Sequence, residues 1–477
     1  MRCRRLWLVG LFAAAAACSS RRHVEAPGFA NGSRLAVRYD EVDGTRLLRA
    51  FYDTARNEEC SFQLIPGGAA CLPRSASLDG WFADSGCTDA LVDIPPVSAG
   101  RTPPQALVTD AANACDAAPT VRLLGDVVPP TEAYYLKSDG TCMQNPPNAK
   151  IVLRRLGDEV PLERFVHATP RVEPLSDAVG AVVLDADDGA RLTMFGHDTA
   201  HDEWTHSIAV GDGQTRWWPV HIAYNYGPGA PGTPGTVFAD SACSRPTGLK
   251  DAHNALCPIT TVIEYVAGDA CQQFTTRLHQ AGAPVAGSDL HAFGATGGCV
   301  PSPPSPSDPI TLYVEMGDAL PDDAYPIATT VDVGGGRVVQ RFDGTPDGVL
   351  PVVARGELHD SARNVDCFVG VAADEARRCL PGGQVDTVFF ADATCTTPII
   401  SASSPPGCAV APSLPAEVTY GTHAYPVGGS LSPATLYAKG TDGSCSVVGP
   451  PPAGASWFTL GAEIPASAYE LATLHTD

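Results

Sequence analysis

The residues best suited to chemistry are the histidines of one short segment, residues 197–206. This segment reads HDTAHDEWTH and contains His197, His201 and His206. Side chains alternate between the two faces of a β-strand, so a strand here would place His197 and His201 on one face. Imidazoles and carboxylates are ligands for transition-metal ions. We therefore take His197, His201 and His206 as candidate metal ligands.

The same segment has two counterparts elsewhere in the chain, and these favour a structural interpretation. Residues 52–57 read YDTARN and residues 359–364 read HDSARN, against HDTAHD at 197–202. An Asp followed by Thr or Ser is typical of a turn in which the Asp side chain caps the backbone. We therefore predict an exposed turn at all three places, with no resident metal and no cofactor.

Other motifs for catalysis or ion binding are weak in this sequence. Acidic turns at residues 185–188 and 321–323 carry carboxylates, but no D-x-D-x-D-G calcium loop is present. No H-E-x-x-H, G-x-S-x-G or C-x-x-C motif occurs. With 53 acidic residues, a pair of neighbouring carboxylates carries no information by itself. We predict a protein without enzymatic activity.

The candidate turn belongs to a unit of roughly 150 residues that occurs three times. One signature reads LGDEVP at 156–161, MGDALP at 316–321 and LGAEIP at 460–465. Another reads WFADSGC at 81–87, VFADSAC at 237–243 and FFADATC at 389–395. A third ends in a cysteine and is followed by prolines, at Cys142, Cys299 and Cys445. We set unit 1 at residues 33–169, unit 2 at 170–329 and unit 3 at 330–477.

The local patterns within each unit predict an all-β fold. Each signature places an aromatic or β-branched pair before a turn and a cysteine, which is typical of a β-hairpin. Residues 34–39 and 311–315 alternate with period two, and no amphipathic run of helical length follows residue 18. About four hairpins in each unit could close as a six-bladed β-propeller. The alternative is three β-sandwich-like domains in a row.

Comparison of the units predicts two disulfides. Cys60 and Cys71 of unit 1 correspond to Cys367 and Cys379 of unit 3, whereas unit 2 lacks both cysteines. Two positions lost together are best explained as partners, because a lone survivor would be a free thiol. We predict the disulfides Cys60–Cys71 and Cys367–Cys379.

Two pairings of the other cysteines stay open. The first is Cys243–Cys257, Cys395–Cys408, Cys115–Cys142 and Cys271–Cys299. The second is Cys87–Cys142, Cys243–Cys299, Cys395–Cys445 and Cys257–Cys271. Each leaves one cysteine over in unit 1 and one in unit 3, and these two could meet if the units close into a ring.

Residues 1–18 have the pattern of an export signal. Three arginines precede an unbroken apolar run that ends at Ala17, and Cys18 follows. The run is shorter than the roughly 20 residues that span a bilayer. Small residues before a cysteine resemble a bacterial lipobox, which implies lipidation of Cys18; plain cleavage near Ala17 is the alternative. Residues 19–32 form a linker in this interpretation.

The composition limits the partners of the exported chain. The full sequence has a net charge of −22, and removal of the three signal arginines makes the exported chain more acidic still. Such a chain repels phosphate backbones, so we predict no nucleic-acid partner. Apolar residues make up 44% of the chain, which is enough for a sizeable core. Cysteines in an exported protein are typically paired in disulfides.

The three signatures make the chain similar to uncharacterised Cys-containing repeat lipoproteins of high-GC predatory soil bacteria. This resemblance spans most of the chain and implies an extracytoplasmic protein, at the outer membrane or cell surface, with no known site residues. We predict a non-enzymatic binding or scaffold protein that is attached to the membrane by its lipid and has an envelope glycan or protein as ligand. The alternative is an extracytoplasmic glycan hydrolase that uses carboxylates in a propeller channel.

Overall fold

The computed structural model describes residues 28–477 apart from internal gaps. The gaps are residues 75–79, 95–103, 110–117, 138–139, 145–151, 210–213, 226–235, 252–257, 267–274, 295–296, 304–310, 322, 346–352, 386, 404–413, 441–442 and 453–454. The predicted export signal, the predicted lipidation site Cys18 and four further cysteines therefore lie outside the described residues; the four are Cys115, Cys257, Cys271 and Cys408.

Each unit begins with a four-stranded antiparallel meander. Alternate residues of its first strand in unit 1, Leu35, Val37 and Tyr39, are buried, which fixes one face of the sheet toward a core. The meanders consist of β2 (Leu35–Val42), β3 (Thr45–Asp53), β4 (Glu58–Ile65) and β5 (Gly68–Leu72); β14 (Val179–Ala186), β15 (Arg191–Asp198), β16 (Glu203–Ala209) and β17 (Thr215–Pro219); and β26 (Val338–Gly344), β27 (Val353–Asp360), β28 (Val365–Val371) and β29 (Arg377–Pro381).

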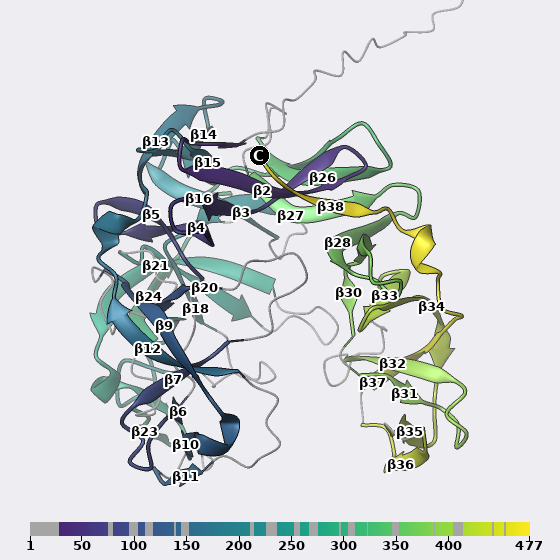
Figure 1. Ribbon diagram of the computed structural model, residues 1–477. Helices are drawn as coiled ribbons and strands as arrows, with labels where there is room; N and C mark the ends of the chain where they lie inside the picture. The colour runs from purple at the N-terminus through teal and green to yellow at the C-terminus, as the bar shows by residue number, and fades with distance from the viewer. Residues whose placement is uncertain are drawn as a thin grey trace, which may run out of the picture.

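Linking strands join the three meanders into one assembly, which we call the ring and which lies at one end of the molecule (Figure 1). The linking strands are β13 (His167–Pro174), β25 (Thr329–Val333) and β38 (Ala472–Thr476), and the short β1 (Phe29–Ala30) adds to β15. Strand β13 pairs with β5 of unit 1 and β14 of unit 2. Strand β25 pairs with β26, and Ile327 before it bridges to Arg216 of unit 2. Strand β38 pairs with β2, and Leu471 before it bridges to Arg378, so the end of the chain closes the ring onto its beginning.

From each meander the chain leaves the ring, forms a small β domain and returns; we call these domains legs 1 to 3. Leg 1 contains β6 (Trp81–Phe82), β7 (Ala90–Asp93), β8 (Ala106–Thr109), β9 (Thr120–Val128), η1 (Pro130–Glu132), β10 (Tyr134–Leu136), β11 (Cys142–Gln144), β12 (Leu153–Glu159) and η2 (Leu162–Arg164). Leg 2 contains β18 (Ile222–Asn225), β19 (Thr247–Asp251), β20 (Thr261–Val266), β21 (Thr275–Val285), η4 (Gly287–Asp289), β22 (His291–Phe293), β23 (Cys299–Pro301) and β24 (Thr311–Ala319). Leg 3 contains β30 (Gly383–Gln384), β31 (Phe389–Phe390), β32 (Pro398–Ser403), β33 (Glu417–Tyr420), β34 (His423–Leu431), β35 (Leu436–Lys439), β36 (Cys445–Gly449), β37 (Ala455–Leu460) and η5 (Ala466–Ala468).

The legs share one plan and extend from the same side of the ring (Figure 1). In leg 2, strands β18, β19, β24, β21 and β20 close into a barrel that includes a parallel pair, β18 with β20. Leg 3 has the corresponding parallel pair, β30 with β33. The C-terminus lies in the ring, at the opposite end of the molecule from the β10–β11 and β35–β36 hairpins (Figure 1).

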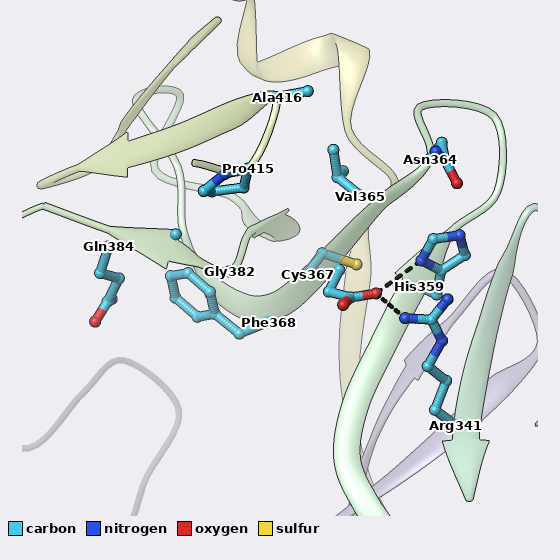
Figure 2. Close-up of a pocket in the computed structure, with 12 residues that line it drawn as sticks. Arg341, His359, Asn364, Val365, Cys367, Phe368, Gly382, Gln384, Pro415 and Ala416 are labelled. Atoms are coloured by element: carbon cyan, nitrogen blue, oxygen red, sulfur yellow. Dashed lines mark hydrogen bonds and ion pairs between the residues drawn. The ribbon is translucent and has the colours of Figure 1, made fainter. Parts of the chain in front are cut away.

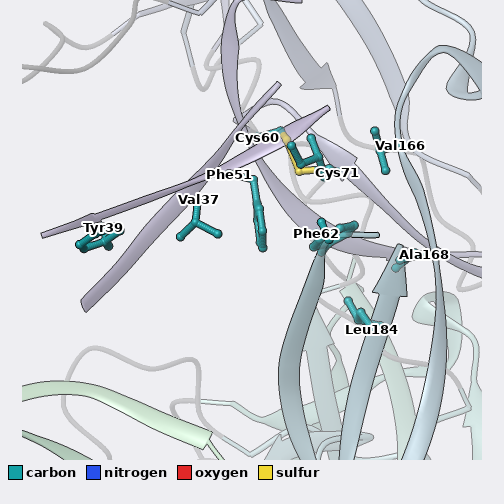
Figure 3. Packing of buried hydrophobic residues seen from close by; sticks show 12 residues of the cluster. Val37, Tyr39, Phe51, Cys60, Phe62, Cys71, Val166, Ala168 and Leu184 are labelled. Carbon is teal, nitrogen blue, oxygen red and sulfur yellow. A yellow bond between two sulfur atoms is a disulfide. The ribbon is translucent and has the colours of Figure 1, made fainter. Parts of the chain in front are cut away.

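The core of the ring crosses the boundary between units (Figure 3). Phe51 and Phe62 of unit 1 make an edge-to-face contact with ring centroids 5.2 Å apart. They belong to a cluster that includes Ala168 of the linking strand and Leu184 of unit 2. Because buried apolar area is the main stabilising contribution, the shared cluster ties the stability of unit 1 to the presence of unit 2.

The all-β prediction is confirmed, and no α-helix occurs among the described residues. None of these residues forms a helix long and apolar enough to cross a bilayer. The described residues do not show a six-bladed propeller. Propeller blades are separate sheets, whereas one ladder here runs through the meanders of units 1 and 2. The sandwich-like alternative fits the structure, with the addition that hydrogen-bonded strands join the units.

Five disulfides are present among the described residues. Cys60–Cys71 joins β4 to β5 and Cys367–Cys379 joins β28 to β29, as their joint loss in unit 2 predicts. The other three are Cys87–Cys142, Cys243–Cys299 and Cys395–Cys445. The second of the two open pairings is therefore correct for these cysteines and the first is wrong. The pairing of Cys257 with Cys271 and the contact between Cys115 and Cys408 stay predictions.

Unit 2 fills the place of the missing disulfide with a tryptophan. Trp217 stands at the position of Cys71 and Cys379 and is fully buried. A Cβ added at Gly196 would lie 2.8 Å from Trp217 Cε3, so the absence of a side chain at Gly196 makes room for the indole. The Trp217 indole Nε1 donates a hydrogen bond of 3.3 Å to the carbonyl oxygen of Gly344 in unit 3.

Candidate functional site

The three Asp-Thr/Ser-Ala segments form the predicted capped turns. In each, the Asp Oδ1 accepts a hydrogen bond from the backbone N–H two residues later. The three bonds are Ala55 to Asp53 at 3.0 Å, Ala200 to Asp198 at 2.8 Å and Ala362 to Asp360 at 3.1 Å. The shared part of the segment is therefore structural.

The histidines of unit 2 do not converge. Strand β15 ends at Asp198, so His201 lies in the turn, and the expectation that it shares a strand face with His197 is wrong. His201 Nδ1 lies 3.0 Å from Asp198 Oδ2, and His197 Nε2 lies 3.1 Å from Asp202 Oδ1. Over the residues that the structure describes, no group of three or more His, Cys, Asp or Glu side chains could hold a metal ion.

His206 lies on β16, is half-buried and is the direct cross-strand neighbour of Trp218 on β17. Burial, with a smaller effect of Lys250, lowers the pKa of His206 to about 4. Burial also lowers the pKa of His221, against the opposing effect of Glu203. The His221 ring lies 6.2 Å from that of Trp204. Neutral imidazoles in an aromatic cluster act as packing residues at physiological pH.

The mid-unit signature is also used for structure. Asp84 accepts hydrogen bonds from the backbone N–H groups of Thr88 and Asp89, which lower the pKa of Asp84 to about 2. Hydrogen bonds likewise lower the pKa of Asp240 and Asp392 at the equivalent positions. The cysteines of this signature have positive φ and form disulfides with the hairpins that follow; they are Cys87, Cys243 and Cys395.

A pocket of about 800 Å³ lies where leg 3 meets the ring (Figure 2). It is lined by Arg341, His359, Asn364, Val365, Asp366, Cys367, Phe368, Gly382, Gly383, Gln384, Pro415 and Ala416. Asp366 and Phe368 are two residues apart on β28, so they project from the same face of the sheet. His359 on β27 is the direct cross-strand neighbour of Asp366. Three neighbouring positions of one sheet face therefore supply His359, Asp366 and Phe368 to the pocket.

Asp366 is held in place by two basic side chains. His359 Nδ1 lies 2.8 Å from Asp366 Oδ1, and the Arg341 guanidinium donates to the same oxygen. The Asp366 side chain is nevertheless 50% exposed. A fixed, half-exposed carboxylate can accept a hydrogen bond from a ligand without first losing conformational freedom.

The pocket opens because the chain has two glycines at its edge. Gly382 and Gly383 follow Pro381, whereas Val220 and His221 follow the corresponding Pro219 in unit 2. A Cβ added at Gly383 would lie 2.6 Å from Pro415 Cγ, so a side chain there would displace the loop of leg 3.

The candidate metal ligands His197, His201 and His206 do not line this pocket. Cys367 lines it but was predicted for its disulfide, and no lining residue was predicted as a ligand-binding residue. One signal could have found them. At the positions of Arg341, His359, Asp366 and Phe368, unit 1 has Arg38, Tyr52, Glu59 and Ser61, and unit 2 has Val182, His197, Trp204 and His206. Unit 3 alone combines a carboxylate and an aromatic ring on this face with a glycine pair beside it.

The fold and the pocket define a disulfide-bearing, all-β repeat protein with a polar pocket between its ring and one leg. Its disulfides indicate an oxidising, extracytoplasmic environment. The model of a family of unknown function, DUF7481, matches residues 230–468, which is just over half of the 477 residues. The chain belongs to this family, and the matched segment contains every residue that lines the pocket. No curated protein and no solved structure matches the chain.

Proposed function

We propose that this protein is a non-enzymatic binding protein of the cell envelope and that its ligand site is the pocket between the ring and leg 3. One observation carries the proposal. Of three equivalent sheet faces, the face in unit 3 presents a half-exposed carboxylate, Asp366, fixed by Arg341 and His359 beside an open cavity. Proteins bind small ligands in cavities that place a few polar groups among apolar ones.

The composition of the pocket supports binding over glycan hydrolysis. Glycosidases use two carboxyl groups that flank the scissile bond. Among the described residues that line the pocket, Asp366 is the one carboxylate. Both of its basic neighbours contact the same oxygen, so Asp366 is held in one orientation without a second carboxylate opposite it among the described lining residues.

The proposal places the protein on the envelope by a lipid on Cys18, in keeping with its resemblance to repeat lipoproteins of high-GC predatory soil bacteria. Metabolic labelling with palmitate tests the anchor. Wild type is expected to take up label and to partition with membranes. The Cys18→Ser variant is expected to do neither, and equal labelling of both proteins would contradict the anchor.

Retention of a small molecule from digested envelope tests the binding function. The mature protein is mixed with the digest, separated by ultrafiltration and denatured, and the released molecules are identified by mass spectrometry. We expect wild type to retain a compound that Asp366→Asn does not retain. Glu59→Gln is the matched control, because Glu59 pairs with Arg38 on the equivalent face of unit 1. Equal retention by all three proteins, no retention, or a change in the composition of the digest over hours would overturn the proposal.

A further inference from the structure

We propose that the pocket binds a neutral oligosaccharide; this inference rests on the proposed function and names its ligand class. Sugars present hydroxyl groups that donate and accept hydrogen bonds, together with patches of C–H groups on the ring faces. A complementary site needs planar polar side chains around an aromatic or other apolar surface. The pocket supplies both, since Asp366, Asn364 and Gln384 are polar and Phe368 is aromatic.

The carboxylate of Asp366 is arranged for a hydroxyl donor. Arg341 and His359 both contact Oδ1, which leaves Oδ2 as an acceptor for a ligand. A hydrogen bond from a hydroxyl to a charged carboxylate is stronger than one between neutral groups. Asn364 lies at the same end of the pocket, and Gln384 lies at the opposite end (Figure 2).

Phe368 is held as a flat apolar surface. A Cβ added at Gly370, the next residue on this face of β28, would lie 2.8 Å from Phe368 Cε2. The phenyl ring therefore lies over Gly370 and depends on the absence of a side chain there. Phe368 and Pro415 both line the pocket (Figure 2), so a sugar ring bound there has two apolar side chains to contact.

Charge and size favour a neutral ligand of more than one sugar ring. The charge of Arg341 is compensated by Asp366 and by Asp332, whose Oδ1 lies 3.4 Å from Arg341 Nε. With a net charge of −22, the chain also repels anions at long range. The volume of about 800 Å³ lies in the upper part of the range of roughly 300–1,000 Å³ that is usual for ligand pockets. Because the pocket is an open one, we expect a dissociation constant on the order of 0.1–1 mM.

Calorimetric titration with defined trisaccharides tests the inference. The probes are triacetylchitotriose, cellotriose and maltotriose, and glucose 6-phosphate is the anionic comparison. We expect at least one trisaccharide to bind wild type and Glu59→Gln equally. We expect its affinity to fall at least tenfold in Asp366→Asn and in Phe368→Ala. Because Phe368 also packs against the cluster that contains Leu380 and Tyr469, Gln384→Ala at an exposed position is a third variant, with an expected loss of three- to tenfold.

Three results would overturn the inference: no binding of any trisaccharide, binding that Asp366→Asn leaves unchanged, or binding of glucose 6-phosphate alone. The retention experiment separates this failure from failure of the proposed function. If wild type retains a compound that is not a saccharide, and Asp366→Asn does not, the binding function stands and the saccharide inference is wrong.

Discussion

The equivalent faces of units 2 and 3 have the same strands and opposite characters. In unit 2, Trp204 and the half-buried His206 lie on β16, and His221 packs beside Trp204. In unit 3, Asp366 and Phe368 occupy the positions of Trp204 and His206, and glycines stand where Val220 and His221 stand in unit 2. Large side chains therefore occupy this face in unit 2, whereas in unit 3 the same face borders the pocket that we propose as a ligand site.

This difference shows that the three units share their backbone structure and differ in the side chains on the faces of their sheets. The capped turns, the hairpins that carry disulfides and the linking strands recur in every unit, because each is required to build the ring and its legs. The residues compared above differ between units and lie on sheet faces whose side chains do not form the shared turns, disulfides or linking strands. We therefore expect a functional site in this protein where one unit has smaller side chains than the other two units at equivalent positions.

The largest expected effect is the loss of the residue that replaces the disulfide in unit 2. Trp217→Ala leaves a cavity beside Gly196 and removes the hydrogen bond to Gly344. We expect a loss of about 3–5 kcal/mol in the free energy of unfolding, measured by guanidinium titration. A loss below about 1 kcal/mol would show that Trp217 does not take over the role of the disulfide.

The next effect comes from the corresponding disulfide of unit 3. Replacing both Cys367 and Cys379 by serine removes a cross-link over a sequence separation of 12 residues. The chain-entropy model gives a loss of about 3 kcal/mol, to be measured by the same titration. Wild type under reducing conditions is the control. If the double variant is as stable as oxidised wild type, the hairpin does not depend on its cross-link.

A smaller effect is expected from acid, and it belongs to unit 2. The pKa of His206 is about 4 in the folded protein, below its ordinary value of 6.5, so the unfolded chain binds this proton more tightly. Stability is therefore lost as pH falls from about 6.5 toward 4, and His206 alone accounts for about 2 kcal/mol at pH 5. The His206→Phe variant copies Phe368 of unit 3. Between pH 7.5 and pH 5, we expect its free energy of unfolding to fall by about 2 kcal/mol less than that of wild type. Urea titrations at both pH values measure it, and equal losses in both proteins would contradict the assignment.

Much of the fold could be predicted from the sequence because its signals are local. Alternating apolar residues, turn residues before cysteines and the joint loss of two cysteines each depend on a few neighbouring positions. Closure of the units into a ring was expected from the sequence as one possibility, but the strands that close it were not identified. Strand β38 pairs with β2 through residues such as Thr476 and Arg38, which are far apart in the sequence.

The candidate site was predicted less well than the fold, for two physical reasons. The sequence pattern predicts His197 and His201 on one strand, but β15 ends at Asp198. His201 therefore lies in the capped turn and contacts Asp198. The pocket depends on where side chains are missing, at Gly382 and Gly383. A sequence does not show which loop lies against such a position, and here it is the loop that contains Pro415.

The central claim is that unit 3 has a ligand site because it lacks the side chains that fill unit 2. Calorimetric titration of Gly382→Val with the trisaccharide that binds wild type tests this claim most directly. The variant copies Val220 of unit 2, and its added Cβ would lie 3.3 Å from the carbonyl oxygen of Asp366. We expect the variant to keep the thermal midpoint of wild type within a few degrees and to lose measurable binding. A folded Gly382→Val protein that binds the trisaccharide as tightly as wild type does would contradict the claim.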